Sequence, residues 1–213
     1  MVKQIKHPLI EHKLSLMRDV NCSNEMFRKL LTEISILMGY ELFESLPLEE
    51  GEEKITPTKG TYIAKAIKQR IVLLPILRAG LAMSEPLKDY VPNAISAHIG
   101  LRRNEETLKP EIYSSELPKD TDCKVFIFDP MLATGGSAIF ALDFLSERGF
   151  KDISFVSLIA SRKGLEIVEK AYPNSNIYVV AIDEILNDKG YIVPGLGDAG
   201  DRVFGIEKGE TTR

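Results

Sequence analysis

Short apolar runs recur along the chain after residue 70, each bounded by polar or glycine residues. They read IVLLP (71–75), AISAHIG (94–100), VFIFD (125–129), ISFVSLIA (153–160) and IYVVAI (177–182). Runs of this kind, with little alternation between apolar and polar positions, are typical of strands that are buried on both faces. We therefore predict a sheet whose strands are mostly covered by other elements.

Stretches with helical periodicity precede these runs and separate them. Residues 24–43 place apolar side chains at steps of three and four, with Asn24 as a candidate cap, and similar patterns span 138–148 and 163–171. Strands that alternate with helices indicate an α/β fold with a mostly parallel sheet and helices on its faces. Ligands of such sheets bind beyond the carboxyl ends of the strands.

Length and composition favour one domain over residues 1–213, with an N-terminal helical arm at about 1–50. The chain has 213 residues, of which 44% are hydrophobic, enough for one sizeable core. The acidic run at 49–53 is interpreted as a solvated turn at the boundary of the arm. No apolar stretch approaches the roughly 18 residues of a membrane span, and the first residues lack an apolar signal core. We expect a cytoplasmic protein with no membrane partner.

Charge and metal-ligating residues narrow the class of protein further. The net charge is −4 and the 27 basic residues are scattered, so no nucleic acid partner is expected. Cys22 and Cys123 lack the spacing of a zinc or redox pair. His7 and His12 are separated by Pro8, and no third ligand follows nearby. We predict no metal held directly by protein side chains.

The stretch VFIFDPMLATGGS (125–137) combines a buried strand with a turn suited to an anion. If the turn opens a helix, its free N–H groups and the helix dipole favour a phosphate. Thr134 and Ser137 add hydroxyl donors, while Gly135 and Gly136 allow the backbone to approach closely. No lysine follows, which excludes a nucleoside-triphosphate P-loop. A plain strand-to-helix turn, capped by Thr134 or Ser137, is the alternative.

Asp129 adds a second chemical group to this turn. A carboxylate at the end of an apolar strand is costly unless it caps a helix, pairs with a charge or meets a ligand. Beside a monophosphate cradle, it is placed to accept hydrogen bonds from two vicinal sugar hydroxyls. The stretch therefore predicts a ribose 5-phosphate site.

The same stretch resembles the phosphoribosyl-diphosphate signature of the type I phosphoribosyltransferases. Its single acid followed by Pro130 and Met131 is similar to the uracil-specific branch of that family. Other segments resemble this branch in the same order, namely HPLIEHKLSLMRD (7–19), PILRAGL (75–81), RNEETL (103–108) and GYIVPGLGDAGDRVFG (190–205). We call residues 129–137 the phosphate loop and residues 190–205 the base loop.

The resemblance implies an activity and a set of site residues. The activity is transfer of the 5-phosphoribosyl group of phosphoribosyl diphosphate to N1 of uracil, giving UMP and diphosphate in pyrimidine salvage. A C-terminal hood would bind the base. The residues implied for phosphoribosyl diphosphate are Arg78, Arg103, Asp129, Pro130, Met131, Leu132, Ala133, Thr134, Gly135, Gly136, Ser137 and Asp198; those for uracil are Ile192, Gly197, Asp198 and Ala199; those for catalysis are Asp129, Arg103 and Asp198.

Further expectations concern cofactor, assembly and motion. The family resemblance implies Mg²⁺ bound mainly through phosphoribosyl diphosphate, a homodimer or higher homo-oligomer, and GTP as an effector found in some relatives. The charged segment 102–113 (RRNEETLKPEIY) is interpreted as a lid that closes over the substrate. A simple exposed loop is the alternative for that segment.

Other interpretations remain at this point. Arg78 and Arg103 could form surface salt bridges, and the base loop could be a plain connection. A transcriptional regulator on the same fold would show a basic face or a DNA-binding module, and neither is visible. A transferase for a purine or for orotate is a further alternative, although orotate would need an added cation, and only Lys189 lies at the edge of the base loop.

Overall fold

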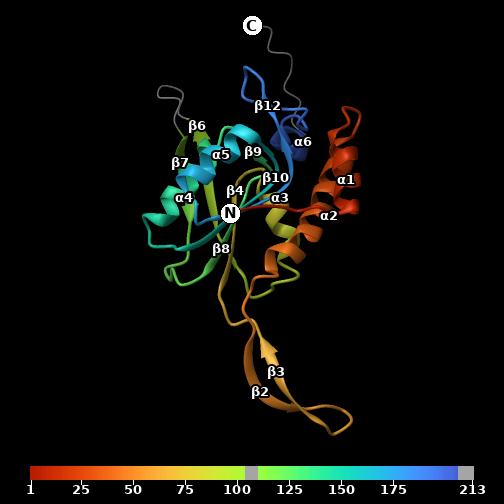
Figure 1. Ribbon diagram of the computed structural model, residues 1–213, viewed down its shortest axis with the longest axis vertical. Helices are drawn as coiled ribbons and strands as arrows, with labels where there is room; N and C mark the ends of the chain where they lie inside the picture. The colour runs from red at the N-terminus through yellow and green to blue at the C-terminus, as the bar shows by residue number, and fades with distance from the viewer. Residues whose placement is uncertain (104–109, 206–213) are drawn as a thin grey trace.

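A mostly parallel sheet forms the centre of the molecule. The computed structural model describes residues 1–103 and 110–205. In this part of the chain the sheet has nine strands, in the order β1-β11-β10-β8-β4-β6-β7, with β5 beside β4 and β9 beside β10 (Figure 1). Its strands are β1 (Val2–Gln4), β4 (Ile71–Leu77), β5 (Ile95–Ser96), β6 (His98–Arg103), β7 (Pro110–Glu116), β8 (Lys124–Phe128), β9 (Met131–Leu132), β10 (Asp152–Ser161) and β11 (Asn176–Asp183). All these pairings are parallel except that of β6 with β7, so the predicted α/β class is confirmed.

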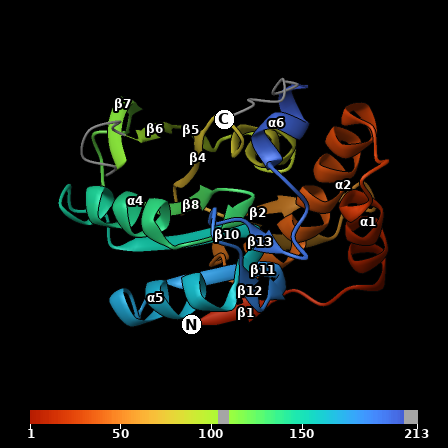
Figure 2. The same ribbon diagram turned by 90° about the horizontal axis from the view of Figure 1, so that it is seen from above.

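Helices cover both faces of the sheet, which explains why its central strands read as continuous apolar runs. On one face lie α1 (Pro8–Arg18), α2 (Asn24–Phe43), α3 (Leu81–Ser84) and the short 3-10 helix η1 (Glu85–Leu87), packed on residues such as Leu73 and Phe126. On the other face α4 (Gly136–Ser146) and α5 (Arg162–Ala171) pack on Val72, Val125 and their neighbours (Figure 2). Adjacent residues of one strand thus enter different cores.

The N-terminal residues add an edge strand that the sequence did not predict. β1 pairs in parallel with β11, with Val2 opposite Ile177. The terminal ammonium of Met1 also donates a hydrogen bond to the carbonyl oxygen of Ser175 at 2.7 Å. Three residues are too few to show a period, so only the partner strand reveals this element.

The acidic run 49–53, interpreted as a solvated turn, is instead part of a strand. β2 (Glu49–Ile55) pairs antiparallel with β3 (Thr61–Ala66), and the register shifts between Glu50 and Glu53. The resulting hairpin projects away from the sheet (Figure 1), and every residue of β2 is exposed. Glutamates are tolerated there because neither face of this hairpin is buried against the body of the protein. An interpretation based on burial could not recognise such a strand.

Several boundaries of helices and strands also differ from the predicted ones. The side chain of Ser23, and not that of Asn24, caps α2 by accepting a hydrogen bond from the Met26 N–H at 3.2 Å. Helix α4 starts two residues earlier than predicted, with Gly135 as its cap and no side-chain cap from Thr134 or Ser137. The run 94–100 divides into β5 and the start of β6.

The last elements form a hood over the carboxyl ends of the strands. They are β12 (Ile185–Leu186), β13 (Ile192–Val193) and α6 (Ala199–Phe204) (Figure 1). Helix α2 supports this hood, because the Arg28 guanidinium donates a hydrogen bond to the Val203 carbonyl oxygen at 3.1 Å. In the described part of the chain, no helix has both the length and the apolar character needed to cross a membrane.

Candidate active site

A cavity of about 370 Å³ lies where the base loop faces the ends of β4, β8 and β9. It joins residues far apart in sequence, as ligand sites of open α/β sheets do. Its lining consists of Arg78, Ala79, Asp129, Met131, Ala133, Gly190, Tyr191, Asp198, Ala199, Gly200, Asp201 and Phe204. The structure thus brings together Arg78, the start of the phosphate loop and part of the base loop.

Asp129 follows β8 and reaches both this cavity and a smaller one beside it. Its Oδ1 accepts a hydrogen bond from the Met131 N–H at 3.3 Å. Burial raises the pKa of the Asp129 carboxyl to about 6, and the Met131 hydrogen bond offsets only part of this effect. The carboxylate is therefore ionised at neutral pH but weakly solvated, which makes it receptive to hydroxyl donors or positive charge.

Gly80 allows the backbone behind Asp129 to pack closely. A Cβ at this position would lie 2.1 Å from the carbonyl oxygen of Phe128, the residue before Asp129. Any side chain would push the end of β8 out of place. Gly80 therefore contributes to the position of the carboxylate without touching the cavity.

The phosphate loop surrounds a second cavity of about 70 Å³. Residues 131–138 line it together with Asp129 and Phe155. Gly135 has a φ of 82°, in the left-handed region that favours glycine, and it caps α4. The first N–H groups of α4 lack intrahelical partners, so this turn provides donors and a positive helix end for an anion. Its size and chemistry suit a phosphate group.

The phosphate loop is anchored from behind by α5, a contact that the sequence did not predict. The Ser161 hydroxyl donates a hydrogen bond to the Ala133 carbonyl oxygen at 2.5 Å and accepts one from the Gly164 N–H at 2.8 Å. A Cβ on Gly164 would lie 2.1 Å from the same Ala133 oxygen. Ser161 was recognisable from sequence as a helix cap, but its link to the phosphate loop depends on tertiary packing.

Arg78 follows β4 and is exposed at the mouth of the larger cavity. Its guanidinium carbon lies 4.9 Å from the centre of the Phe204 ring, a cation–π contact with the hood. Arg103 ends β6, where its backbone pairs with Pro110. The position of the Arg103 side chain lies outside the described part of the structure, as do residues 104–109 of the predicted lid 102–113. The ends of that segment, 102–103 and 110–113, belong to the paired strands β6 and β7.

The base loop contributes to the site in two ways. Asp198 and Ala199 line the cavity, whereas Ile192 and Gly197 do not. Ile192 is buried in β13, and Gly197 has a φ of 77°, so these two residues shape the loop. Asp198 also caps α6, because its Oδ1 accepts a hydrogen bond from the Asp201 N–H at 3.0 Å.

Some cavity residues were not singled out from the sequence. They are Ala79, Gly190, Tyr191, Gly200, Asp201 and Phe204. Most belong to the base loop itself, so their place in that segment was the available signal. Which of its side chains turn inward depends on the hairpin of β12 and β13 and on the direction of α6.

Comparison with known proteins identifies the family of a chain with this geometry. A family model described as uracil phosphoribosyltransferase matches residues 4–206. The chain belongs to the uracil phosphoribosyltransferase family. Curated relatives named uracil phosphoribosyltransferase include one from Streptococcus mutans, 50% identical with 95% of this chain and 97% of the relative covered. One from Pediococcus pentosaceus is 51% identical, with the same coverage.

A solved structure shares this fold over nearly the whole chain. The structure described as the AQ2163 protein from Aquifex aeolicus has a TM-score of 0.89 and 40% sequence identity. The match covers 98% of this chain and 100% of that one. The family match confirms the expected type I phosphoribosyltransferase-like fold. It also confirms that the chain is an enzyme that transfers a phosphoribosyl group.

Proposed function

We propose that this chain transfers the 5-phosphoribosyl group of phosphoribosyl diphosphate to N1 of uracil, producing UMP and diphosphate. The observation that carries the proposal is the single cavity shared by Asp129, Arg78 and the base loop, with a phosphate-sized cradle beside it. Sugar phosphate, diphosphate and base would each meet suitable groups there. Relatives of about 50% identity carry the corresponding name.

The chemistry requires positioning and charge stabilisation and no covalent nucleophile. The bond from C1′ to the diphosphate oxygen breaks, the bond from C1′ to N1 of uracil forms, and the N1 proton is released. Positive charge develops on the ribose while negative charge collects on the leaving group. The Asp129 carboxylate would accept hydrogen bonds from the ribose hydroxyls and stabilise the positive charge. Arg78 and Arg103 would bind the diphosphate.

The phosphate loop would hold the 5-phosphate. Thr134 and Ser137 would donate from their hydroxyls, and the backbone from Met131 to Gly136 would form the cradle, with Leu132 and Ala133 on its wall. Pro130 does not line this cavity; its carbonyl oxygen accepts hydrogen bonds from the Leu158 and Ile159 N–H groups, each at 3.1 Å, so it would fix the start of the loop. Backbone N–H groups at the start of α4 would complete the donors. Asp198 would approach the phosphoribosyl diphosphate from the hood.

Mg²⁺ would arrive with the substrate and neutralise charge on the departing diphosphate. Within residues 1–103 and 110–205, no group of three or more His, Cys, Asp or Glu side chains is placed to hold a metal ion. Magnesium typically keeps several waters and binds largely through substrate phosphates, so oxygens of phosphoribosyl diphosphate would supply most of its ligands. The protein would supply orientation and anion-binding groups.

Uracil would be recognised by the backbone of the base loop near Ile192, Gly197 and Ala199. Uracil presents acceptors at O2 and O4 with the N3–H donor between them. A loop that presents N–H, C=O and N–H in matching order satisfies all three. Cytosine reverses two of these pairings, and each unmatched buried group costs roughly 1–3 kcal/mol. The Ile192 side chain, being buried outside the cavity, would act by fixing the loop.

Location and assembly are the next two parts of the proposed function: the protein is expected to be cytoplasmic and to form a homodimer. The homodimer is expected because the β2–β3 hairpin exposes Ile55, Tyr62 and Ile63, with no cover from its own chain in the described residues. GTP activation rests on the family resemblance alone. Adding GTP to the assay tests it directly.

The experiment that tests the function is diphosphate release from phosphoribosyl diphosphate and Mg²⁺ with a panel of bases. We expect turnover with uracil and 5-fluorouracil, which share the recognised edge, and little with cytosine, orotate or hypoxanthine. Faster turnover with another base would replace the proposed substrate. A gel-shift experiment with generic DNA, expected to show no binding, tests the regulator alternative.

A further inference from the structure

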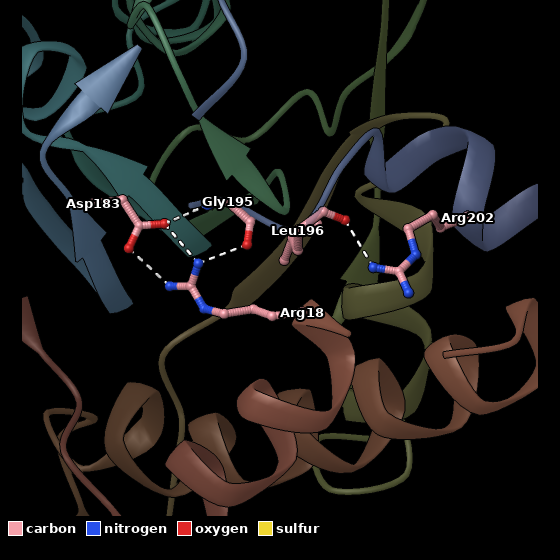
Figure 3. Close-up of polar contacts among 5 residues, drawn as sticks. All are labelled: Arg18, Asp183, Gly195, Leu196 and Arg202. Atoms are coloured by element: carbon pink, nitrogen blue, oxygen red, sulfur yellow. Dashed lines mark hydrogen bonds and ion pairs between the residues drawn. The ribbon is translucent and has the colours of Figure 1, made fainter. Parts of the chain in front are cut away.

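An ion pair outside the cavity holds the base loop from behind. Arg18, the last residue of α1, faces Asp183, the last residue of β11, with N–O distances of 2.7 and 2.8 Å (Figure 3). Only 22% of the Arg18 side chain and 8% of the Asp183 side chain are exposed. Buried ion pairs are weak evidence for stability, because desolvation offsets their attraction. The other groups that Arg18 and Asp183 hydrogen-bond therefore indicate what this pair does.

The pair binds both backbone polar groups of Gly195 in the base loop. The Gly195 N–H donates a hydrogen bond to Asp183 Oδ2 at 3.0 Å, and its carbonyl oxygen accepts one from Arg18 Nη1 at 2.6 Å (Figure 3). Gly195 has a φ of 60°, and a Cβ there would lie 2.0 Å from the Ile192 carbonyl oxygen. The tight turn and its two charged partners together set the position of Gly195.

Arg202 of α6 holds the next residue of the loop. Its Nη1 donates hydrogen bonds to the carbonyl oxygens of Leu196 at 2.9 Å and Met17 at 2.5 Å. Its Nη2 donates to the carbonyl oxygens of Asp19 and Cys22, each at 3.1 Å. The guanidinium also lies 4.4 Å from the centre of the Phe27 ring. Arg202 therefore ties the base loop to the connection between α1 and α2.

The two anchors act on consecutive residues immediately before the proposed base-reading groups. Gly195 and Leu196 are buried, and the anchoring side chains hydrogen-bond their backbone groups. Gly197 follows with a φ of 77°, and Asp198 and Ala199 line the cavity. The direction of the Gly197 and Ala199 backbone groups therefore depends on where Gly195 and Leu196 are held. A rotation of this short segment would turn donors and acceptors away from the base.

We infer that Arg18, Asp183 and Arg202 are positioning residues for base selection, so that the N-terminal helix α1 is part of the machinery that recognises uracil. None of the three lines the cavity. The inference rests on the proposed function and assigns the N-terminal arm a specific part in it. Substitution of these residues should therefore impair the use of uracil and leave the phosphate loop intact, because that loop is anchored separately on α5.

Steady-state kinetics of the full chain with Asp183→Asn test the inference. Asn keeps the size and one acceptor but removes the charge that binds Arg18 and the Gly195 N–H. We expect the KM for uracil to rise on the order of ten- to a hundredfold, as small displacements of positioning groups do, with little change in the KM for phosphoribosyl diphosphate. The preference for uracil over cytosine, as a ratio of kcat/KM values, should fall as well. A merely destabilised protein would lose activity without changing that ratio.

Glu184→Gln is the matched control, since it removes the same charge one residue away. Glu184 pairs with Arg162 on the surface, with 65% of its side chain exposed, and its kinetics should stay near those of the wild type. Arg202→Lys provides an independent variant if Asp183→Asn fails to fold, because an ammonium cannot reproduce the planar set of donors. An unchanged uracil KM in the folded variants, or an equal rise in both KM values, would overturn the inference. A wild-type protein that does not use uracil would instead overturn the proposed function itself.

Discussion

At the scale of single residues, Asp129 shows how the site combines reactivity with an energetic cost. Its carboxyl group is held at the end of a buried strand with one backbone donor, and its pKa rises to about 6 because burial disfavours the charged form. At neutral pH the free protein therefore carries a poorly solvated negative charge. Binding of hydroxyl groups and of a cationic transition state would relieve this cost.

Replacement of Asp129 by Asn is expected to lower kcat strongly and to stabilise the protein at neutral pH. A folded-state pKa raised from 3.8 to about 6 means that the carboxyl lowers stability progressively as pH rises through this range, by up to about 3 kcal/mol on a full linkage estimate. Asn removes this term. Melting curves at pH 4 and pH 8 measure it, with the full gain of the variant over wild type present at pH 8 and only about 0.6 kcal/mol of it left at pH 4. Unchanged kcat would rule out the proposed role of Asp129.

At the scale of elements, two anchored loops form the site. The phosphate loop is held by the Ser161 hydroxyl and the close approach of Gly164, both at the start of α5. The base loop is held by Arg18, Asp183 and Arg202. Because the anchors belong to different elements, the affinities for the two substrates should be separable by mutation.

Gly164→Ala tests the first anchor. The added methyl would meet the Ala133 carbonyl oxygen at 2.1 Å, so either α5 or the phosphate loop must shift. We expect weaker binding of phosphoribosyl diphosphate and a destabilisation of about 1–3 kcal/mol, typical of overpacking. Gly60→Ala is the control, since the nearest atom to its Cβ would be Thr56 Oγ1 at 3.5 Å. Isothermal titration with phosphoribosyl diphosphate should give a lower affinity for Gly164→Ala than for Gly60→Ala. Equal affinities would contradict this role for Gly164.

Ala199→Phe tests the base loop at the cavity wall. Ala199 is 3% exposed and begins α6, so a phenyl ring there would have to occupy space inside the cavity or displace the helix. Uracil turnover should be abolished while phosphoribosyl diphosphate still binds. Ile192→Ala should weaken uracil binding only modestly and should not admit cytosine, because Ile192 supports the backbone that reads the base. Normal uracil turnover by Ala199→Phe would place the base site elsewhere.

At the scale of the whole molecule, the β2–β3 hairpin is the feature that the single chain does not explain. A two-stranded hairpin is marginally stable in water unless another surface covers it. This one projects from the sheet (Figure 1) with Ile55 73% exposed and Tyr62 and Ile63 nearly half exposed. A second copy of the chain would supply the missing cover.

Sedimentation at micromolar concentration is therefore expected to show a homodimer. Replacement of residues 50–65 by a short Gly-Ser connection should shift the protein toward monomer, because the exposed apolar side chains are removed. Substitution of Lys59 at the hairpin turn by Ala, a change that leaves those side chains in place, should not. A wild-type monomer at this concentration would refute the assembly.

The sequence by itself determined the class of fold, most of its buried strands, the helix at 24–43 and the segments that carry the chemistry. A strand buried on both faces requires a continuous apolar run, and a helix packed on a sheet requires apolar residues at steps of three and four. Both patterns can be recognised from neighbouring residues in the sequence. The phosphate loop was recognisable for the same reason, since a glycine-rich turn between a strand and a helix suits an anion. The position of Asp129 beside Arg78 and the base loop followed from the rule that strand ends converge.

Only the tertiary structure decided which distant groups meet. The bond between Ser161 and Ala133, the pairing of Arg18 with Asp183 and the parallel partner of β1 each join residues that no local pattern connects. The hairpin 49–66 carries glutamates in a strand because neither of its faces packs on the body of the chain. Its sequence therefore shows no pattern of buried apolar positions. Local periodicity reports whether a residue is buried, whereas the identity of its partner depends on how the whole chain packs.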